Sequence, residues 1–260
     1  MLPSFEGPKA KLTRAVEHLD TLRIEAERFL GSDAYSAVRH IDPKNGDHVW
    51  RMKIDQPAPV RLGVLLGDVV HNLRSGLDHL AWQLALIRTP TPRNTTAFPI
   101  FFLANTGPAG KGFNPDGRKT LLDLPEDAQK VIESVQPYQR PGSLSLALWL
   151  LYKMSITDKH RFILAPLGRL RGASIPISHA APLGSIVLGM RECDEGGELL
   201  RITAGSVCYL HKKEEPSFVF QIGVDIPDIT GRHDVVASLD LMHKALRDEL
   251  FPKFEQFLPK

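Results

Sequence analysis

Hydrophobic and polar residues alternate along this chain with two different periods. Apolar residues recur every three or four positions in five stretches, which is the spacing that places them on one face of a helix. Two β-like runs, over residues 35–41 and 48–54, flank an Asn45-Gly46 turn signal and predict a short hairpin. The five predicted helices span about residues 8–30, 60–87, 126–135, 144–157 and 234–254.

The pattern changes between residues 173 and 226, where short β-rich runs are separated by Gly, Pro or charged turns. Residues 98–102 form an apolar run that predicts either a short strand or a buried plug, and the Gly-rich residues 105–117 predict a surface loop. The predicted strands of the β-rich region cover residues 185–190, 199–204, 206–210 and 218–224.

The predicted fold is α+β, mainly a helical bundle with an N-terminal β-hairpin and a small antiparallel sheet inserted before the C-terminal helix. We expect a single domain over residues 1–260, with the bundle formed by residues 8–171 and 232–258 and the β lobe by residues 173–227. The chain is long enough to bury a substantial core in this way.

Composition excludes several classes of protein. The two cysteines, Cys193 and Cys208, lack a C-x-x-C spacing, so neither a zinc ribbon nor a disulfide framework is expected. The longest apolar run, residues 144–152, is too short to span a bilayer, and residues 1–8 do not resemble a secretory signal. We therefore expect a soluble cytoplasmic protein without a membrane partner.

The net charge of +2 is too small to indicate nucleic-acid binding by bulk attraction. Residues 137–171 nevertheless hold six basic residues and one acidic residue. This segment is either a surface that faces a polyanion or a basic stretch whose charge is offset elsewhere on the surface.

The second predicted helix carries the most distinctive residues. Its apolar positions fall within one arc, and the opposite side has short or planar polar side chains in place of the Lys, Glu and Gln of an ordinary solvated helix. Small residues at positions 63, 67, 81 and 85 form an edge along which we expect a second helix or a second subunit, with the polar residues lodged in a groove. We call the polar residues the polar stripe: Asp68, His71, Asn72, Arg74, Ser75, Asp78 and His79.

The spacing Arg74-x4-His79 resembles the R-x4–6-H motif of the HEPN superfamily, whose all-helical domains include metal-independent RNases of toxin–antitoxin and phage-defence systems. The resemblance covers about one helix, with Ser75 in the place of the polar residue that usually follows the Arg, and it does not include the β lobe. It implies an endoribonuclease with Arg74 and His79 as catalytic residues, RNA as the substrate, a homodimer with a composite cleft, and a cognate protein partner or antitoxin.

The chemistry of the two residues suits this implication. A neutral His can take the ribose 2′-OH proton because its pKa lies near the working pH, and an Arg can stabilise charge on the phosphate. Five residues on a helix separate two side chains by about 140°, so one helix does not easily present both to one phosphate. We expect Asp78 and His71 to orient Arg74, and Asn72 and Asp68 to orient His79.

Other interpretations of the polar stripe stay open. Arg74 with His71 and Asp78 is also typical of a buried ion-pair network, which would make the protein a non-catalytic protein- or RNA-binding interaction module. A metal site built from Asp68, His79 and a His of another helix lacks the H-x3-H or E-x-x-H spacing that supplies two ligands on one face, so we expect no metal and no cofactor. Nucleotide-binding, serine-hydrolase and zincin motifs are missing from the sequence.

A possible second site lies at the end of the fourth predicted helix, at Asp158, His160 and Arg161. Basic residues at a helix C-terminus favour the helix dipole, which is one explanation of their presence. The other is that His160 and Arg161 complete the groove of the polar stripe, with Asp158 paired to Arg74 or Arg161.

Overall fold

The computed structural model describes residues 3–102, 115–139, 141–160, 167–176, 186–189, 194–209, 215–226 and 229–257. The chain forms two compact units. The first contains residues 1–21, 64–164 and 236–260, and the second contains residues 22–63 and 165–235.

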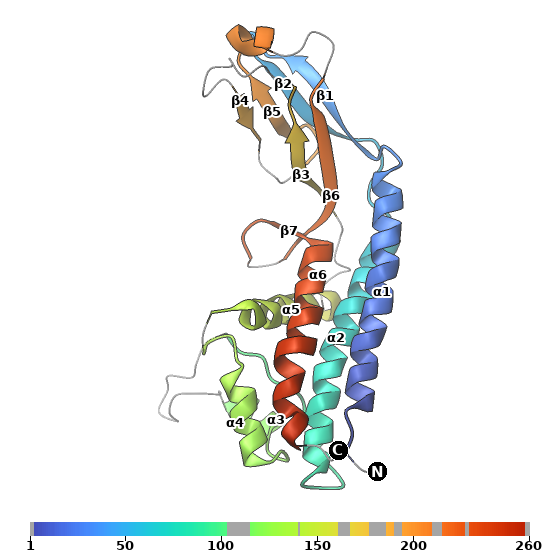
Figure 1. Cartoon of the computed structure of the whole chain (residues 1–260), viewed down its shortest axis with the longest axis vertical. Helices are drawn as coiled ribbons and strands as arrows, with labels where there is room; N and C mark the ends of the chain where they lie inside the picture. The colour runs from blue at the N-terminus through green and yellow to red at the C-terminus, as the bar shows by residue number, and fades with distance from the viewer. Residues whose placement is uncertain are drawn as a thin grey trace. The chain divides into compact units, whose positions relative to one another are not determined.

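Helices dominate the first unit. Within it α1, α2 and α6 run alongside one another and α5 lies across them (Figure 1). After α6 the chain continues as a π-helix, η2, and a 3-10 helix, η3. The helices span Glu6–Leu30 (α1), Val60–Leu86 (α2), Pro115–Thr120 (α3), Glu126–Ser134 (α4), Ser143–His160 (α5), Val235–Lys244 (α6), Ala245–Leu250 (η2) and Phe251–Phe257 (η3). The last turns of α1, from residue 22, and the first residues of α2 and α6, 60–63 and 235, are counted in the second unit.

The core of the first unit forms around α2 and α5. The apolar arc predicted for α2 is buried from Leu62 to Leu84, with Leu66, Leu73 and Leu80 at 0% exposure, whereas its last predicted member, Ile87, lies beyond the end of the helix and is 40% exposed. The segment after α2 has no regular structure, and Phe98 and Ile100 are buried, so it is the plug and not the strand. In the part of the chain that the structure describes, no helix combines the length and the hydropathy needed to cross a bilayer.

The second unit contains two antiparallel sheets. One has the strand order β1-β2-β5-β4 and the other the order β3-β6-β7. The predicted hairpin is confirmed, because β1 pairs with β2 and Gly46 in the connecting turn has a φ of 77°, which favours glycine. The strands span Tyr35–Ile41 (β1), His48–Ile54 (β2), Leu167–Ser174 (β3), Ile186–Leu188 (β4), Glu198–Ile202 (β5), Ser217–Asp225 (β6) and Arg232–Asp234 (β7).

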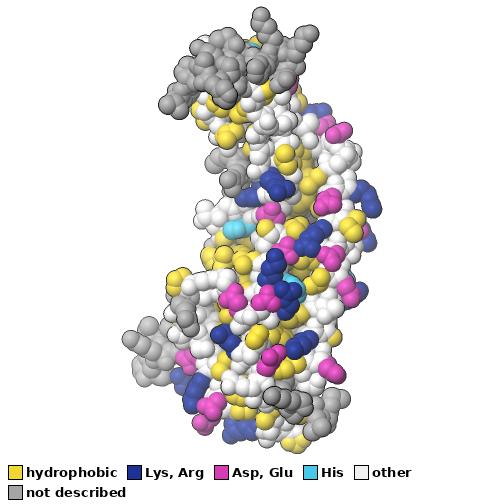
Figure 2. All heavy atoms as spheres, in the orientation of Figure 1, with side chains coloured by type: hydrophobic (Ala, Val, Ile, Leu, Met, Phe, Trp, Pro, Cys, Tyr) yellow, Lys and Arg dark blue, Asp and Glu magenta, His cyan; other side chains and the backbone are white. Residues whose placement is uncertain are grey.

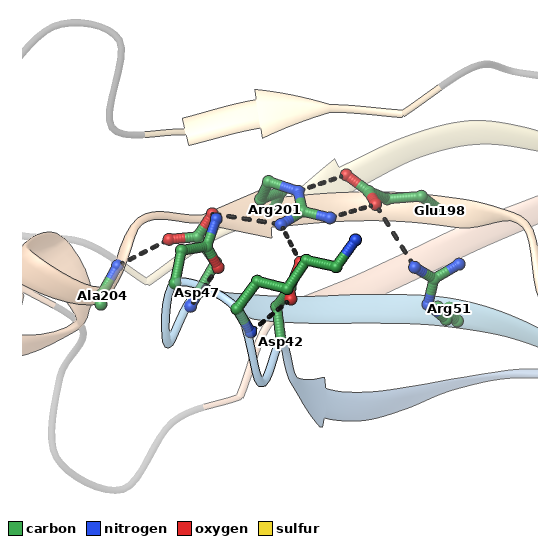
Figure 3. Close-up of polar contacts among 8 residues, drawn as sticks. Asp42, Asp47, Arg51, Glu198, Arg201 and Ala204 are labelled. Carbon is green, nitrogen blue, oxygen red and sulfur yellow. Dashed lines mark hydrogen bonds and ion pairs between the residues drawn. The ribbon is translucent and has the colours of Figure 1, made fainter.

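Arg201 on β5 ties the hairpin turn to the next strand of the sheet (Figure 3). Its Nε and Nη2 donate to the carboxylate of Glu198 at 2.9 and 2.8 Å, and its Nη1 donates to Asp42 at 2.9 Å and to Asp47 at 3.1 Å. The guanidinium lowers the pKa of Asp42 and of Glu198, chiefly through these hydrogen bonds. The network therefore stabilises the sheet while the carboxylates are ionised.

The α+β class and the small antiparallel sheets are confirmed, whereas several boundaries differ from the prediction. The hairpin, expected in the bundle, pairs with β5 and belongs to the second unit. The predicted strand over residues 206–210 is wrong over residues 206–209, where the 3-10 helix η1 (Ala204–Tyr209) lies, with the backbone N–H of Ser206 donating to the carbonyl of Thr203 three residues back. The HEPN-like character of the helices stays a prediction.

Candidate functional site on helix α2

Between Val64 and Trp82, six residues of α2 face outward along one side of the helix. Val64 is 46% and Trp82 36% exposed, His71 and His79 are exposed, and Asp68 and Ser75 are partly exposed. We call them the outer face of α2: Val64, Asp68, His71, Ser75, His79 and Trp82. Four members of the polar stripe thus lie at the surface of the protomer, namely Asp68, His71, Ser75 and His79, whereas Asn72 is buried and the side chain of Arg74 is only 16% exposed.

Asn72 departs from the prediction that it orients His79. It is 8% exposed, and its Nδ2 donates to the backbone carbonyl of Asp68 at 2.8 Å. The amide is therefore engaged within its own helix, one turn back.

Arg74 is held inside the first unit. Its side chain is 16% exposed, and its Nη2 donates to Oδ1 of Asp78 at 2.7 Å and to the carbonyl of Phe98 at 2.6 Å. The backbone N–H of Phe98 in turn donates to the same Oδ1 of Asp78 at 3.1 Å. Asp78 therefore orients Arg74 as predicted, and both side chains bind the backbone of the plug. His71, the other residue expected to orient Arg74, is exposed and forms no hydrogen bond to it within the described residues.

A third side chain serves the plug in the same way. Gln136, which is 1% exposed, donates from Nε2 to the carbonyl of Pro99 at 3.0 Å and accepts the N–H of Phe101 on Oε1 at 2.9 Å. A buried segment without regular structure needs such partners, because unpaired backbone groups in the interior are costly. Arg74 and Asp78 thus complete a structural network.

His79 does not join this network. It is exposed on the outer face, about 140° around the helix from Arg74 by helical geometry. Within the described residues, no hydrogen bond or ion pair connects His79 to Asn72, Asp68 or Arg74. The guanidinium and the imidazole therefore do not converge within one protomer.

Asp158 of α5 meets α2, as the second-site hypothesis predicts, but at Gly67 and not at Arg74. A Cβ on Gly67 would lie 2.6 Å from Oδ1 of Asp158, so only glycine allows this close approach. Burial and the neighbouring carboxylate of Asp68 raise the pKa of Asp158, while His71 and Lys159 act in the opposite direction. Of the other two second-site residues, His160 ends α5 and its side chain is not described, and Arg161 lies outside the described residues.

His18 of α1 is a member of this cluster that sequence reasoning missed. Its Nδ1 lies 3.9 Å from Oδ2 of Asp68, and its side chain is 18% exposed. The sequence did hold one indication that His18 lies beside the core, because it stands three residues after Ala15 and four before Leu22, which are apolar and buried. Two imidazoles and two carboxylates, those of His18, His71, Asp68 and Asp158, thus lie close enough on three helices to interact electrostatically.

The geometry does not indicate a metal centre. Among the residues that the structure describes, no group of three or more His, Cys, Asp or Glu side chains is arranged to hold a metal ion. Comparison of the chain with family models, with curated proteins and with solved structures found no match.

Proposed function

We propose that this chain is a non-catalytic interaction module that associates with a second copy of itself through the outer face of α2. The observation that carries the proposal is the position of Arg74. It is the sole Lys or Arg between Val64 and Trp82, and its guanidinium binds the plug. The outer face therefore offers no free cation to a phosphate from this stretch, which disfavours both RNA cleavage and RNA binding there.

The order of residues on the outer face supports association with a second copy. In an antiparallel pair of helices related by a two-fold axis, residues equally far from the axis on either side meet. With the axis opposite Leu73, Val64 and Trp82 are each nine residues away, and His71 and Ser75 are each two residues away. An apolar side chain then faces an indole at both ends of the contact.

The same axis places the one exposed acid of the outer face near an imidazole. Asp68 is five residues before Leu73 and His79 is six residues after it, so the carboxylate of one copy can accept a hydrogen bond from the imidazole of the other. Trp82 at the ends of the contact is a residue type enriched in protein interfaces. The order of apolar, polar and charged residues along this side of α2 is thus self-complementary.

The experiment is a charge exchange measured by sedimentation equilibrium. His79→Asp places a carboxylate opposite Asp68 of the second copy and is expected to shift the protein toward monomer. Adding Asp68→His restores the pair with reversed polarity and is expected to restore the dimer. His40→Asp, on exposed β1, is the matched control and leaves the dimer unchanged.

Two results would contradict the proposal. One is a wild-type protein that is monomeric at all concentrations, or a dimer that His79→Asp leaves intact. The other is cleavage of single-stranded RNA by the purified protein that His79→Ala abolishes while the unfolding curve stays unchanged. The second result would return the chain to the ribonuclease that the HEPN resemblance implies.

A further inference from the structure

A groove of about 490 Å³ lies between the N-terminal half of α1 and the C-terminal helical segments of the first unit. Its apolar lining comes from Leu12 and Val16 of α1 and from Phe251 of η3. Leu12 and Phe251 are 4% and 2% exposed. Figure 2 shows hydrophobic side chains between charged ones over α1 and α6, the helices that border the groove.

The charged side chains around the groove are paired within the protein. Lys9 reaches Glu255 at 3.3 Å across the groove, and Arg14 pairs with Glu17 at 2.6 Å on α1. The guanidinium of Arg247 binds the carboxylate of its neighbour Asp248 at 2.6 and 2.8 Å. A ligand in the groove therefore does not need a charge of its own.

His243 is the exception among the polar lining residues. Its ring makes no hydrogen bond or ion pair within the part of the chain that the structure describes, although the side chain is partly buried. Burial, and next the charge of Arg247, lower the pKa of His243. The lowered pKa favours the neutral ring, which offers one hydrogen-bond donor and one acceptor to the groove.

The backbone beside His243 is irregular. The helix changes from α to π at Ala245, two residues after His243, and to 3-10 at Phe251. Single π turns inside helices are rare and occur frequently at functional sites. Here the π segment lies between two residues that line the groove, so it sets their relative positions on the helix.

We propose that this groove binds a small, uncharged and largely apolar molecule with one hydrogen-bonding group, such as an aromatic alcohol. The ring of the ligand packs against Leu12, Val16 and Phe251, and its hydroxyl reaches the imidazole of His243. The volume of the groove lies within the range of about 300–1,000 Å³ for small-molecule sites. The site goes beyond the proposed self-association, because it uses no residue of the outer face of α2.

The test compares two probes of nearly equal size by isothermal titration calorimetry on the full chain. 2-Naphthol carries a hydroxyl and 2-methylnaphthalene does not. We expect saturable binding of both probes, with 2-naphthol the tighter one. His243→Leu is expected to weaken 2-naphthol about fivefold, the effect of one lost neutral hydrogen bond, and to leave 2-methylnaphthalene nearly unchanged.

Two further variants fill the groove itself. Val16→Trp and, independently, Thr13→Trp on the exposed rim are expected to abolish saturable binding of both probes, with unchanged circular dichroism. His40→Leu is the control for loss of an unrelated exposed imidazole. The proposal is overturned if the wild-type protein binds neither probe saturably, if both filled variants bind like wild type, or if His243→Leu does not distinguish the two probes.

Discussion

Replacing Arg74 by Met tests whether the most active-site-like residue of the chain is structural. Methionine keeps an unbranched apolar stem on α2 and removes the guanidinium alone. The carbonyl of Phe98 then loses the hydrogen bond from Arg74, whereas the N–H of Phe98 keeps Asp78 as its acceptor. We therefore expect the carbonyl of Phe98 to be left without a hydrogen-bond donor and α2 to stay folded.

The magnitude follows from the two hydrogen bonds of Nη2. A hydrogen bond to a charged group contributes about 1.5–3 kcal/mol to stability. The bond to Phe98 counts nearly in full, because Phe98 is 0% exposed and its carbonyl finds no water. The pair with Asp78 counts little, because that carboxylate is 32% exposed and is solvated by water when Arg74 is removed. The expected loss is about 2–3 kcal/mol in the free energy of unfolding.

The assay is urea unfolding followed by far-ultraviolet circular dichroism, together with hydrogen exchange of the peptide that contains Phe98. Asp78→Asn keeps an acceptor for the N–H of Phe98 and is expected to cost about 1 kcal/mol. His79→Ala, on the exposed face, is expected to stay within about 0.5 kcal/mol of wild type. An Arg74→Met protein as stable as His79→Ala, with unchanged exchange at Phe98, would refute the structural assignment.

Three further changes test the contacts around α2 and β5. Gly67→Ala and Gly76→Ala should both gain about 1 kcal/mol of helix propensity. Only at Gly67 does the new Cβ clash with a carboxylate, so Gly67→Ala should be less stable than Gly76→Ala by about 1–3 kcal/mol in urea unfolding. Because the pKa of Asp158 is raised in the fold, the wild type loses stability as pH rises through that pKa, and Asp158→Asn should raise the urea midpoint at pH 7 but not at pH 3. The pKa of Asp42 is lowered in the fold, so its ion pair with Arg201 stabilises the hairpin at neutral pH, and this stabilisation is lost as pH falls through the lowered pKa. Arg201→Met should therefore accelerate hydrogen exchange of the hairpin at pH 7, and the difference from wild type should shrink in acid.

The sequence predicted those elements whose pattern repeats over several helical turns or whose two strands are joined by one tight turn. The apolar arc of α2 repeats over its whole length, and the Asn45-Gly46 turn joins two runs that pair in full register. Strand β3 gave no such signal, since Gly168 and Gly172 interrupt it. It forms because β6 pairs with it, and context of this kind overrides weak local propensity.

In the candidate site, too, the contacts between residues close in the sequence could be predicted, and those between distant residues could not. The pair of Arg74 with Asp78 could be predicted, because residues four apart on a helix are neighbours. The carbonyl of Phe98 lies 24 residues from Arg74 along the chain, and His18 reaches Asp68 only because α1 packs beside α2. Neither contact leaves a pattern that spacing alone reveals.

The structure separates the residues of the polar stripe by what lies opposite each of them. Arg74 and Asp78 face the plug, a buried segment whose backbone groups do not pair with one another. The ion pair supplies hydrogen-bond partners to Phe98, and the amide of Gln136 supplies a partner to Pro99, so these side chains are needed for the structure. Asp68 and His79 face outward and are free of that requirement. An Arg and a His five residues apart therefore indicate catalysis only where the Arg is not already the partner of a buried carbonyl, and in this protein it is. The residues that remain available for recognition are the exposed ones, and their two-fold arrangement about Leu73 is the property on which the proposed self-association depends.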